Sequence, residues 1–175
     1  NNVIRENVVI NRATHRGCKT VIGSDNFLME GAHISHDTVV GDRCVFGYGA
    51  KIAGDCVIDT GAVISSNVVE KANTRVGSYA VVQAGTTFSR DVPPYIIAGG
   101  SPVGFHGVNT TIQKSAGVEE KTLKHIANAY RLLFYGQTSV FDACIQIEQQ
   151  VPSSTEISNI IDFVRGTEVG IISKL

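Results

Sequence analysis

From Ile22 to Pro93, eleven of the twelve positions spaced six residues apart hold a large apolar residue. The residue after it is mostly small or turn-forming, and the fourth residue after it is almost always compact. The positions are Ile22, Leu28, Ile34, Val40, Phe46, Ile52, Ile58, Ile64, Glu70, Val76, Val82 and Phe88. Neither a helical period of about 3.6 residues nor simple alternation produces a strict period of six. The pattern predicts a parallel β-helix of hexapeptide repeats.

Three such units close one triangular coil, so residues eighteen apart should stack in columns about 4.8 Å apart. One predicted column consists of Ile34, Ile52, Glu70 and Phe88. A coil cannot cover its own apolar interior, so coils must stack on one another and both ends need caps. The repeat leaves the handedness open. Because Ile4 and Ile10 are already six apart, we expect the chain to begin partway up a solenoid whose lower coils are missing.

Glu70 is the one polar residue among the twelve repeated positions. Burying an unpaired carboxylate is costly. We therefore predict a local bulge that turns Glu70 outward, toward Lys71 or Arg75. A functional buried carboxylate is the less favoured alternative.

The six-residue period has two interruptions. It slips between Thr14 and Val21, which predicts a surface loop ejected from a corner. It stops near Pro93 and Pro94, which remove backbone donors and should end the ladder. We predict three segments: a β-helix over 1–93, a Gly-rich connector over 94–116 and a helical domain over 117–175.

The last segment has a helical period and helix-capping residues. One helix should end at Gly136. A second should begin at Ser139, and a third at Ser153 with Glu156 completing a capping box. The fold class predicted for the whole chain is a β-helix of hexapeptide repeats followed by a small C-terminal α-helical bundle that covers its open end.

Composition excludes several functional classes. The formal net charge of −1 argues against a nucleic-acid partner. No apolar run is long enough to span a membrane, and no signal-peptide pattern is present, so we expect no stable membrane insertion. The four cysteines have neither metal-ligand spacing nor a paired framework, which indicates reduced thiols and a cytoplasmic protein.

The segment from His33 to Asp37 carries the candidate chemistry. Two imidazoles, His33 and His36, flank the inward Ile34, and a carboxylate follows at once. The column arithmetic places His36 directly beneath Gly54, where a backbone without a side chain would let a substrate approach. An imidazole beside an exposed N–H suits acyl transfer, because one group takes a hydroxyl proton and the other holds the oxyanion.

Six short segments of the chain carry a more specific signal than the repeat. They are Ile4-Arg5-Glu6, Asn26-Phe27-Leu28-Met29, His33-x-x-His36-Asp37, Ala53-Gly54, Asp91-Val92-Pro93-Pro94-Tyr95 and Ala127-Asn128-Ala129-Tyr130. In this order they resemble the later part of UDP-N-acetylglucosamine O-acyltransferase, the first enzyme of lipid A biosynthesis. The resemblance implies a left-handed β-helix, a homotrimer with sites between subunits, and transfer of a 3-hydroxyacyl group from acyl carrier protein to the 3-hydroxyl of a nucleotide sugar.

The resemblance also implies site residues. His36 matches the general base, Asp37 its orienting partner, and Gly54 the backbone donor to the oxyanion. A contact between His36 and Asp37 requires a corner, since adjacent strand residues point to opposite faces. The substrate-binding residues that we predict are His33, Met29, Lys71, Asn109 at the nucleotide and Ala84 near the end of the acyl chain. No cofactor and no metal are expected.

Several residues depart from the family pattern, nearly all on the nucleotide-sugar side. Asp55 stands where the family usually has His, and Lys71-Ala72 stand where it usually has His-Gln. Thr111 replaces an acidic residue, and Ser115-Ala116 replace basic ones. The acceptor is therefore left open, and so is whether activity is retained.

Three alternatives remain open beside that reaction: another acceptor, a catalytically silent trimeric relative, and a hexapeptide-fold enzyme such as a zinc-dependent hydratase. For the last, His15, His33 and His36 are the conceivable ligands, but we expect His15 to lie well over a full coil from His36. For acyl transfer itself, we expect the acidic acyl carrier protein to dock near the helical end, where Lys121, Lys124 and Arg131 share one helical face.

Overall fold

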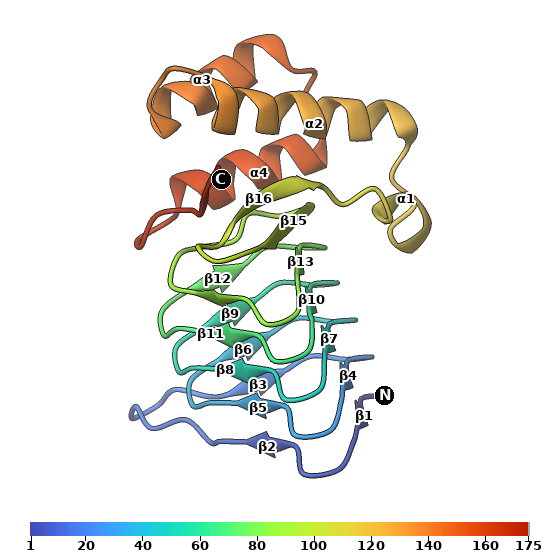
Figure 1. Ribbon diagram of the computed structural model, residues 1–175, viewed down its shortest axis with the longest axis vertical. Coiled ribbons are helices and arrows are strands. Elements are labelled where there is room, and N and C mark those ends of the chain that lie inside the picture. The colour runs from blue at the N-terminus through green and yellow to red at the C-terminus, as the bar shows by residue number, and fades with distance from the viewer. Residues whose placement is uncertain (175) are drawn as a thin grey trace.

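The computed structural model describes residues 1–174 and has a solenoid of two-residue strands with helices stacked on one end (Figure 1). Sheet A contains β1 (Val3–Ile4), β4 (Phe27–Leu28), β7 (Val45–Phe46), β10 (Val63–Ile64) and β13 (Val81–Val82). Sheet B contains β2 (Val9–Ile10), β5 (His33–Ile34), β8 (Lys51–Ile52), β11 (Val69–Glu70) and β14 (Thr87–Phe88). Sheet C contains β3 (Val21–Ile22), β6 (Val39–Val40), β9 (Val57–Ile58) and β12 (Arg75–Val76).

The predicted six-residue register is confirmed without a break from β3 to β14. Strands eighteen residues apart pair in parallel, for example Ile34 with Ile52 and Ile52 with Glu70. The inward residue of each of these strands after β3 is buried, as is the compact residue of each unit. The three apolar columns therefore form one continuous core along the axis.

The corners are made by a backbone conformation that recurs with the same period. Residues with positive φ are Asp25, Gly31, Asp37, Arg43, Gly49, Asp55, Gly61, Asn67, Asn73, Tyr79 and Gly85. The left-handed region favours glycine, asparagine and aspartate, which account for nine of these eleven residues. The turn-forming residues of the hexads thus set the triangular cross-section.

The prediction for Glu70 is wrong, because its side chain points inward and is 1% exposed. β11 pairs in register with β8 and β14, which leaves no bulge to turn Glu70 outward. Thr74 Oγ donates a hydrogen bond of 2.9 Å to Glu70 Oε1, while the buried Oε2 has no partner within residues 1–174. Burial raises the pKa of Glu70 to about 8, so the group avoids a buried charge by staying protonated.

The segment expected to be a connector continues the sheet instead. β15 (Ile96–Gly99) pairs in parallel with β13, and β16 (Gly104–Val108) returns antiparallel to β15. β17 (Ser173–Lys174) then pairs in parallel with β16. The two prolines do not end the ladder, because they lie in the turn before β15 and sheet A resumes beyond them.

The helices are α1 (Ile112–Ser115), α2 (Glu120–Tyr135), α3 (Val140–Gln150) and α4 (Thr155–Arg165), of which the last three pack together above the top coil (Figure 1). Gly136 caps α2 and Ser139 caps α3, as predicted. The start of α4 is one residue later than predicted, because Ser154 rather than Ser153 accepts from the Ile157 N–H. Glu156 is then one position too early for the capping box.

A buried ion pair joins the solenoid to the helices. Asp91 is 1% exposed and accepts hydrogen bonds from Arg75 N (2.8 Å) and Nε (3.1 Å) and from Thr167 Oγ (2.8 Å). Arg75 Nη2 also donates to the Phe163 carbonyl at 2.7 Å. These contacts fix α4 on the top coil.

None of the helices described in residues 1–174 combines the length and the apolarity that a membrane crossing requires.

Candidate functional site

The candidate site lies at the edge where sheet B meets sheet C, here named the BC edge. Between β5 and β6 the chain turns through Asp37, whose φ is 59°. This is the corner that a contact between neighbouring residues requires, and His36 Nδ1 lies 2.9 Å from Asp37 Oδ2. The His36 side chain remains 39% exposed, whereas that of Asp37 is only 4% exposed. A solvent-facing imidazole therefore rests on a buried carboxylate.

Thr14, on the loop below, holds the carboxylate in place. Its backbone N–H and its hydroxyl each donate to Asp37 Oδ2 at 2.9 Å. Burial would raise the pKa of Asp37, but hydrogen bonds from the Thr14 N–H, His36 and the Thr14 hydroxyl outweigh it and hold that pKa well below its usual value. Because an ionised carboxylate only accepts hydrogen bonds, His36 Nδ1 carries the proton in this contact. His36 Nε2 is then free to accept one.

Gly54 lies directly against His36, as the column arithmetic predicts. A Cβ on Gly54 would overlap His36 Cε1 and lie 2.6 Å from Nε2, so another residue here would displace the imidazole. Within residues 1–174 the Gly54 N–H donates no hydrogen bond. At the same position of two other units the N–H bonds to a side chain eighteen residues on, from Ser24 to Asp42 Oδ1 at 2.7 Å and from Asp42 to Thr60 Oγ at 3.2 Å. Gly54 has Ala72 at that place, so its N–H stays available.

The expectation that His15 lies far from His36 is wrong. Its ring centroid is 6.3 Å from that of His36, and its Nε2 is 3.3 Å from Asp55 Oδ1. β2 and β3 start twelve residues apart instead of six, so the extra residues form a loop. The loop leaves the BC edge directly below His36, because β2 pairs with β5 and β3 with β6. The number of residues between His15 and His36 did not predict that the loop folds back beside His36.

Comparisons with known proteins identify the family of the chain. The family described as "Udp N-acetylglucosamine O-acyltransferase; Domain 2" matches residues 91–172, and bacterial transferase hexapeptide repeats match residues 19–54. A UDP-N-acetylglucosamine acyltransferase structure from Bacteroides fragilis is 33% identical, with a TM-score of 0.87 over 98% of this chain and 79% of that one. The chain belongs to the UDP-N-acetylglucosamine O-acyltransferase family.

Two further structures of the family resemble the chain along its whole length. LpxA from Acinetobacter baumannii is 31% identical, with a TM-score of 0.93 over 98% of this chain and 67% of that one. The UDP-N-acetylglucosamine acyltransferase from Arabidopsis is 28% identical, with a TM-score of 0.90 over 100% of this chain and 64% of that one. The β-helix with a C-terminal helical domain is therefore the family fold.

Two more of the predicted site residues, His33 and Lys71, lie on the same side of the solenoid as His36, Asp37 and Gly54. His33 lies on β5, and its Nε2 is 2.6 Å from Asn11 Oδ1. Lys71 is exposed and follows β11 at the same edge, one coil above Gly54. The BC edge thus brings five of the eight predicted site residues to one side of the solenoid.

The other three predicted site residues lie elsewhere in the single chain. Met29 and Ala84 are at the edge where sheet A meets sheet B, named the AB edge. Asn109 is 4% exposed, donates to the Tyr79 carbonyl at 2.8 Å and accepts from Thr111 Oγ at 2.6 Å. It lines a groove of about 250 Å³ over sheet A together with Arg43. One copy of the chain does not join these residues to His36.

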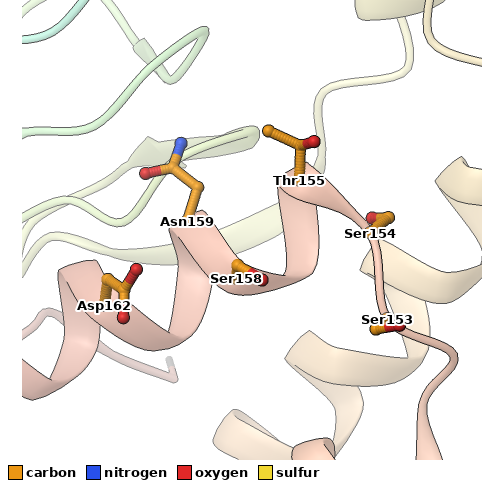
Figure 2. Close-up of a pocket in the computed structure, with 6 residues that line it drawn as sticks. All are labelled: Ser153, Ser154, Thr155, Ser158, Asn159 and Asp162. Atoms are coloured by element: carbon orange, nitrogen blue, oxygen red, sulfur yellow. The ribbon is translucent and has the colours of Figure 1, made fainter.

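A larger groove lies along α4 (Figure 2). It measures about 660 Å³ and is lined by Ser153, Ser154, Thr155, Ser158, Asn159 and Asp162. Figure 2 shows these short polar side chains spread along the start of the helix, with none of the predicted site residues among them. None of these side chains is an imidazole that could act as the general base.

The sequence analysis did not predict that Thr14 holds Asp37, and it placed His15 too far from His36. The register slip at Thr14 was the available signal, because it marked a loop on the solenoid surface. Its contacts could not be read from the slip, since the path of an irregular loop depends on the side chains that it meets at the edge.

Proposed function

We propose that this chain transfers a 3-hydroxyacyl group from acyl carrier protein to the 3-hydroxyl of UDP-N-acetylglucosamine or a related nucleotide sugar, the first step of lipid A biosynthesis, in the cytoplasm. The observation that carries the proposal is the His36 imidazole, held by an ionised Asp37, against the free N–H of Gly54. Membership of the family supports the substrate class.

The reaction follows from the roles of these three groups. His36 Nε2 removes the proton of the sugar hydroxyl as its oxygen attacks the thioester carbonyl. Asp37 stabilises the imidazolium that forms, and the Gly54 N–H holds the oxyanion of the tetrahedral intermediate. When the intermediate collapses, the C–S bond breaks and the carrier thiolate takes the proton from His36. The base is thereby restored for the next turnover.

The direct test uses the purified chain with 3-hydroxyacyl carrier protein and UDP-N-acetylglucosamine. Mass spectrometry should detect the 3-O-acylated nucleotide sugar and the free carrier thiol. Because Asp55 at the BC edge replaces the usual histidine, other nucleotide sugars are assayed in parallel. Product with another sugar alone would favour a different acceptor. No product with any acceptor would favour the catalytically silent relative.

The chain should form a homotrimer with shared sites. Met29 and Ala84 at the AB edge cannot reach His36 in one copy, but the AB edge of a neighbour could face the BC edge. The outward Val39 is 42% exposed, which leaves apolar surface for such contacts. Light scattering should give three times the mass of one chain. A monomeric mass would contradict both the trimer and the shared site.

Acyl carrier protein should dock on the exposed face of α2 formed by Lys121, Lys124 and Arg131. Lys124 pairs with Glu120 at 2.8 Å, and Arg131 is held by Asn128 Oδ1 at 2.9 Å. Reversing Lys124 and Arg131 to glutamate should weaken binding of the acidic carrier at low salt, with a smaller effect at high salt. Calorimetry or surface plasmon resonance would measure this.

The matched control is Arg5→Glu, at the opposite end of the solenoid, which should leave the affinity for the carrier unchanged. Equal affinities of the double variant and the parent chain would exclude the α2 face.

A further inference from the structure

Four ligand-type side chains meet at the BC edge, where the reaction that we propose uses only two. His36 Nδ1 is 2.9 Å from Asp37 Oδ2, and His15 Nε2 is 4.0 Å from the same oxygen. His15 Nε2 is also 3.3 Å from Asp55 Oδ1. Ligand atoms of His15, His36 and Asp37 all lie within 4.8 Å of one another. Two imidazoles and one carboxylate thus converge from the loop and the coil above it, and Asp55 of the next coil adjoins His15.

Asp37 provides a second, independent observation. Its side chain is 4% exposed, and its Oδ1 is buried without a hydrogen-bond partner within residues 1–174. The three donors at Oδ2 satisfy only one of its two oxygens. A buried carboxylate oxygen without a donor is unfavourable, and a cation beside it would compensate that cost.

We propose that His15, His36 and Asp37, with Asp55 beside His15, form a binding site for a divalent transition-metal ion of the zinc class. Imidazole nitrogen and carboxylate oxygen both ligate zinc, at about 2.0–2.2 Å. A tetrahedron of that size has edges of about 3.3 Å, close to the spacings between His15 and Asp55 and between His36 and Asp37. The 4.0 Å separation between His15 Nε2 and Asp37 Oδ2 shortens with a rotation of His15, whose side chain is 61% exposed and lies on a loop.

The ion would oppose acyl transfer, a consequence that rests on the proposed function. To ligate through Nδ1, His36 gives up its Nδ1 proton and carries one on Nε2 instead, so the imidazole stays neutral. Nε2 then has no lone pair with which to accept the proton of a sugar hydroxyl. Asp37 is also taken from its role beside the imidazole. The site is therefore inhibitory, and zinc competes with the general-base function of His36.

The experiment uses the chelator-treated full chain titrated with Zn²⁺ in a calorimeter and with Co²⁺ in a spectrometer. We expect one ion per chain and a visible Co²⁺ absorption typical of tetrahedral coordination. His15→Gln should bind Zn²⁺ at least ten times more weakly, and Asp55→Asn should also bind it more weakly. His106→Gln, which removes an exposed histidine on β16, is the matched control and should bind as the parent chain does.

Two results would overturn the proposal: no stoichiometric binding by the parent chain, or equal affinities of the parent chain and His15→Gln. In the acyl-transfer assay, Zn²⁺ should inhibit the parent chain reversibly, with recovery on adding chelator. His15→Gln should transfer acyl groups without metal and resist Zn²⁺. If the chain binds Zn²⁺ as expected but transfers no acyl group under any condition, the proposed function fails while the metal site stands.

Discussion

Replacing His36 with alanine should slow acyl transfer by about 10²–10⁴-fold, the usual cost of losing a general base. Neutral imidazole is one of the few side chains that can take a hydroxyl proton near neutral pH. The nearby carboxylate of Asp37 cannot replace it, because its pKa is lowered and it is therefore a weaker base. The rate is measured with saturating carrier and sugar, following the acylated product.

The same variant should keep the oligomeric state and the melting temperature of the parent chain. His36 is 39% exposed, and surface substitutions usually change stability by about 0.5 kcal/mol or less. His106→Ala is the control, since it removes an exposed histidine far from the BC edge. Full activity of the His36 variant, or its unfolding, would show that the imidazole is structural and would favour the catalytically silent relative.

Replacing Glu70 with glutamine should make the protein more stable at pH 8, although the site is fully buried. The folded-state pKa of Glu70 is raised to about 8 by burial, above its ordinary value of 4.5. The unfolded chain therefore loses this proton at a lower pH than the folded chain does. The stability linked to Glu70 is present in full below about pH 4.5 and is lost as the pH rises toward 8.

At about 1.4 kcal/mol for each unit of pKa difference, that loss is on the order of a few kcal/mol. Glutamine is neutral at every pH, so the difference in unfolding free energy between the variant and the parent chain should grow from pH 4 to pH 8. Denaturant titrations at several pH values measure it. The control is Glu148→Gln, because the Arg165 pair lowers the pKa of Glu148 and the variant should gain no stability as pH rises. A pH-independent difference at Glu70 would contradict a buried, protonated carboxyl.

The fold could be predicted closely because a period of six leaves few alternatives. Each hexad contains its own inward residue, its compact residue and its corner, and stacking at eighteen residues follows once three hexads close a coil. The same spacing of eighteen residues predicts that His36 lies against Gly54. Caps at Gly136 and Ser139 were equally local, since the residues that make them lie within one helical turn.

Other features depended on contacts between distant parts of the chain. Glu70 points inward because two neighbouring strands hold β11 in register, and that constraint outweighs the cost of a buried carboxyl once it is protonated. The hairpin after Pro94 forms because β13 offers an open sheet edge, which composition does not reveal.

The candidate site divides in the same way between local and distant information. His36, Asp37 and Gly54 are related by the repeat, so the amino-acid sequence was enough to bring them together. Thr14 and His15 belong to a loop that interrupts the repeat, and their place beside Asp37 and Asp55 follows only from how that loop folds back along the BC edge. Periodic segments specify their own geometry, whereas an irregular loop takes its path from the tertiary contacts that it makes.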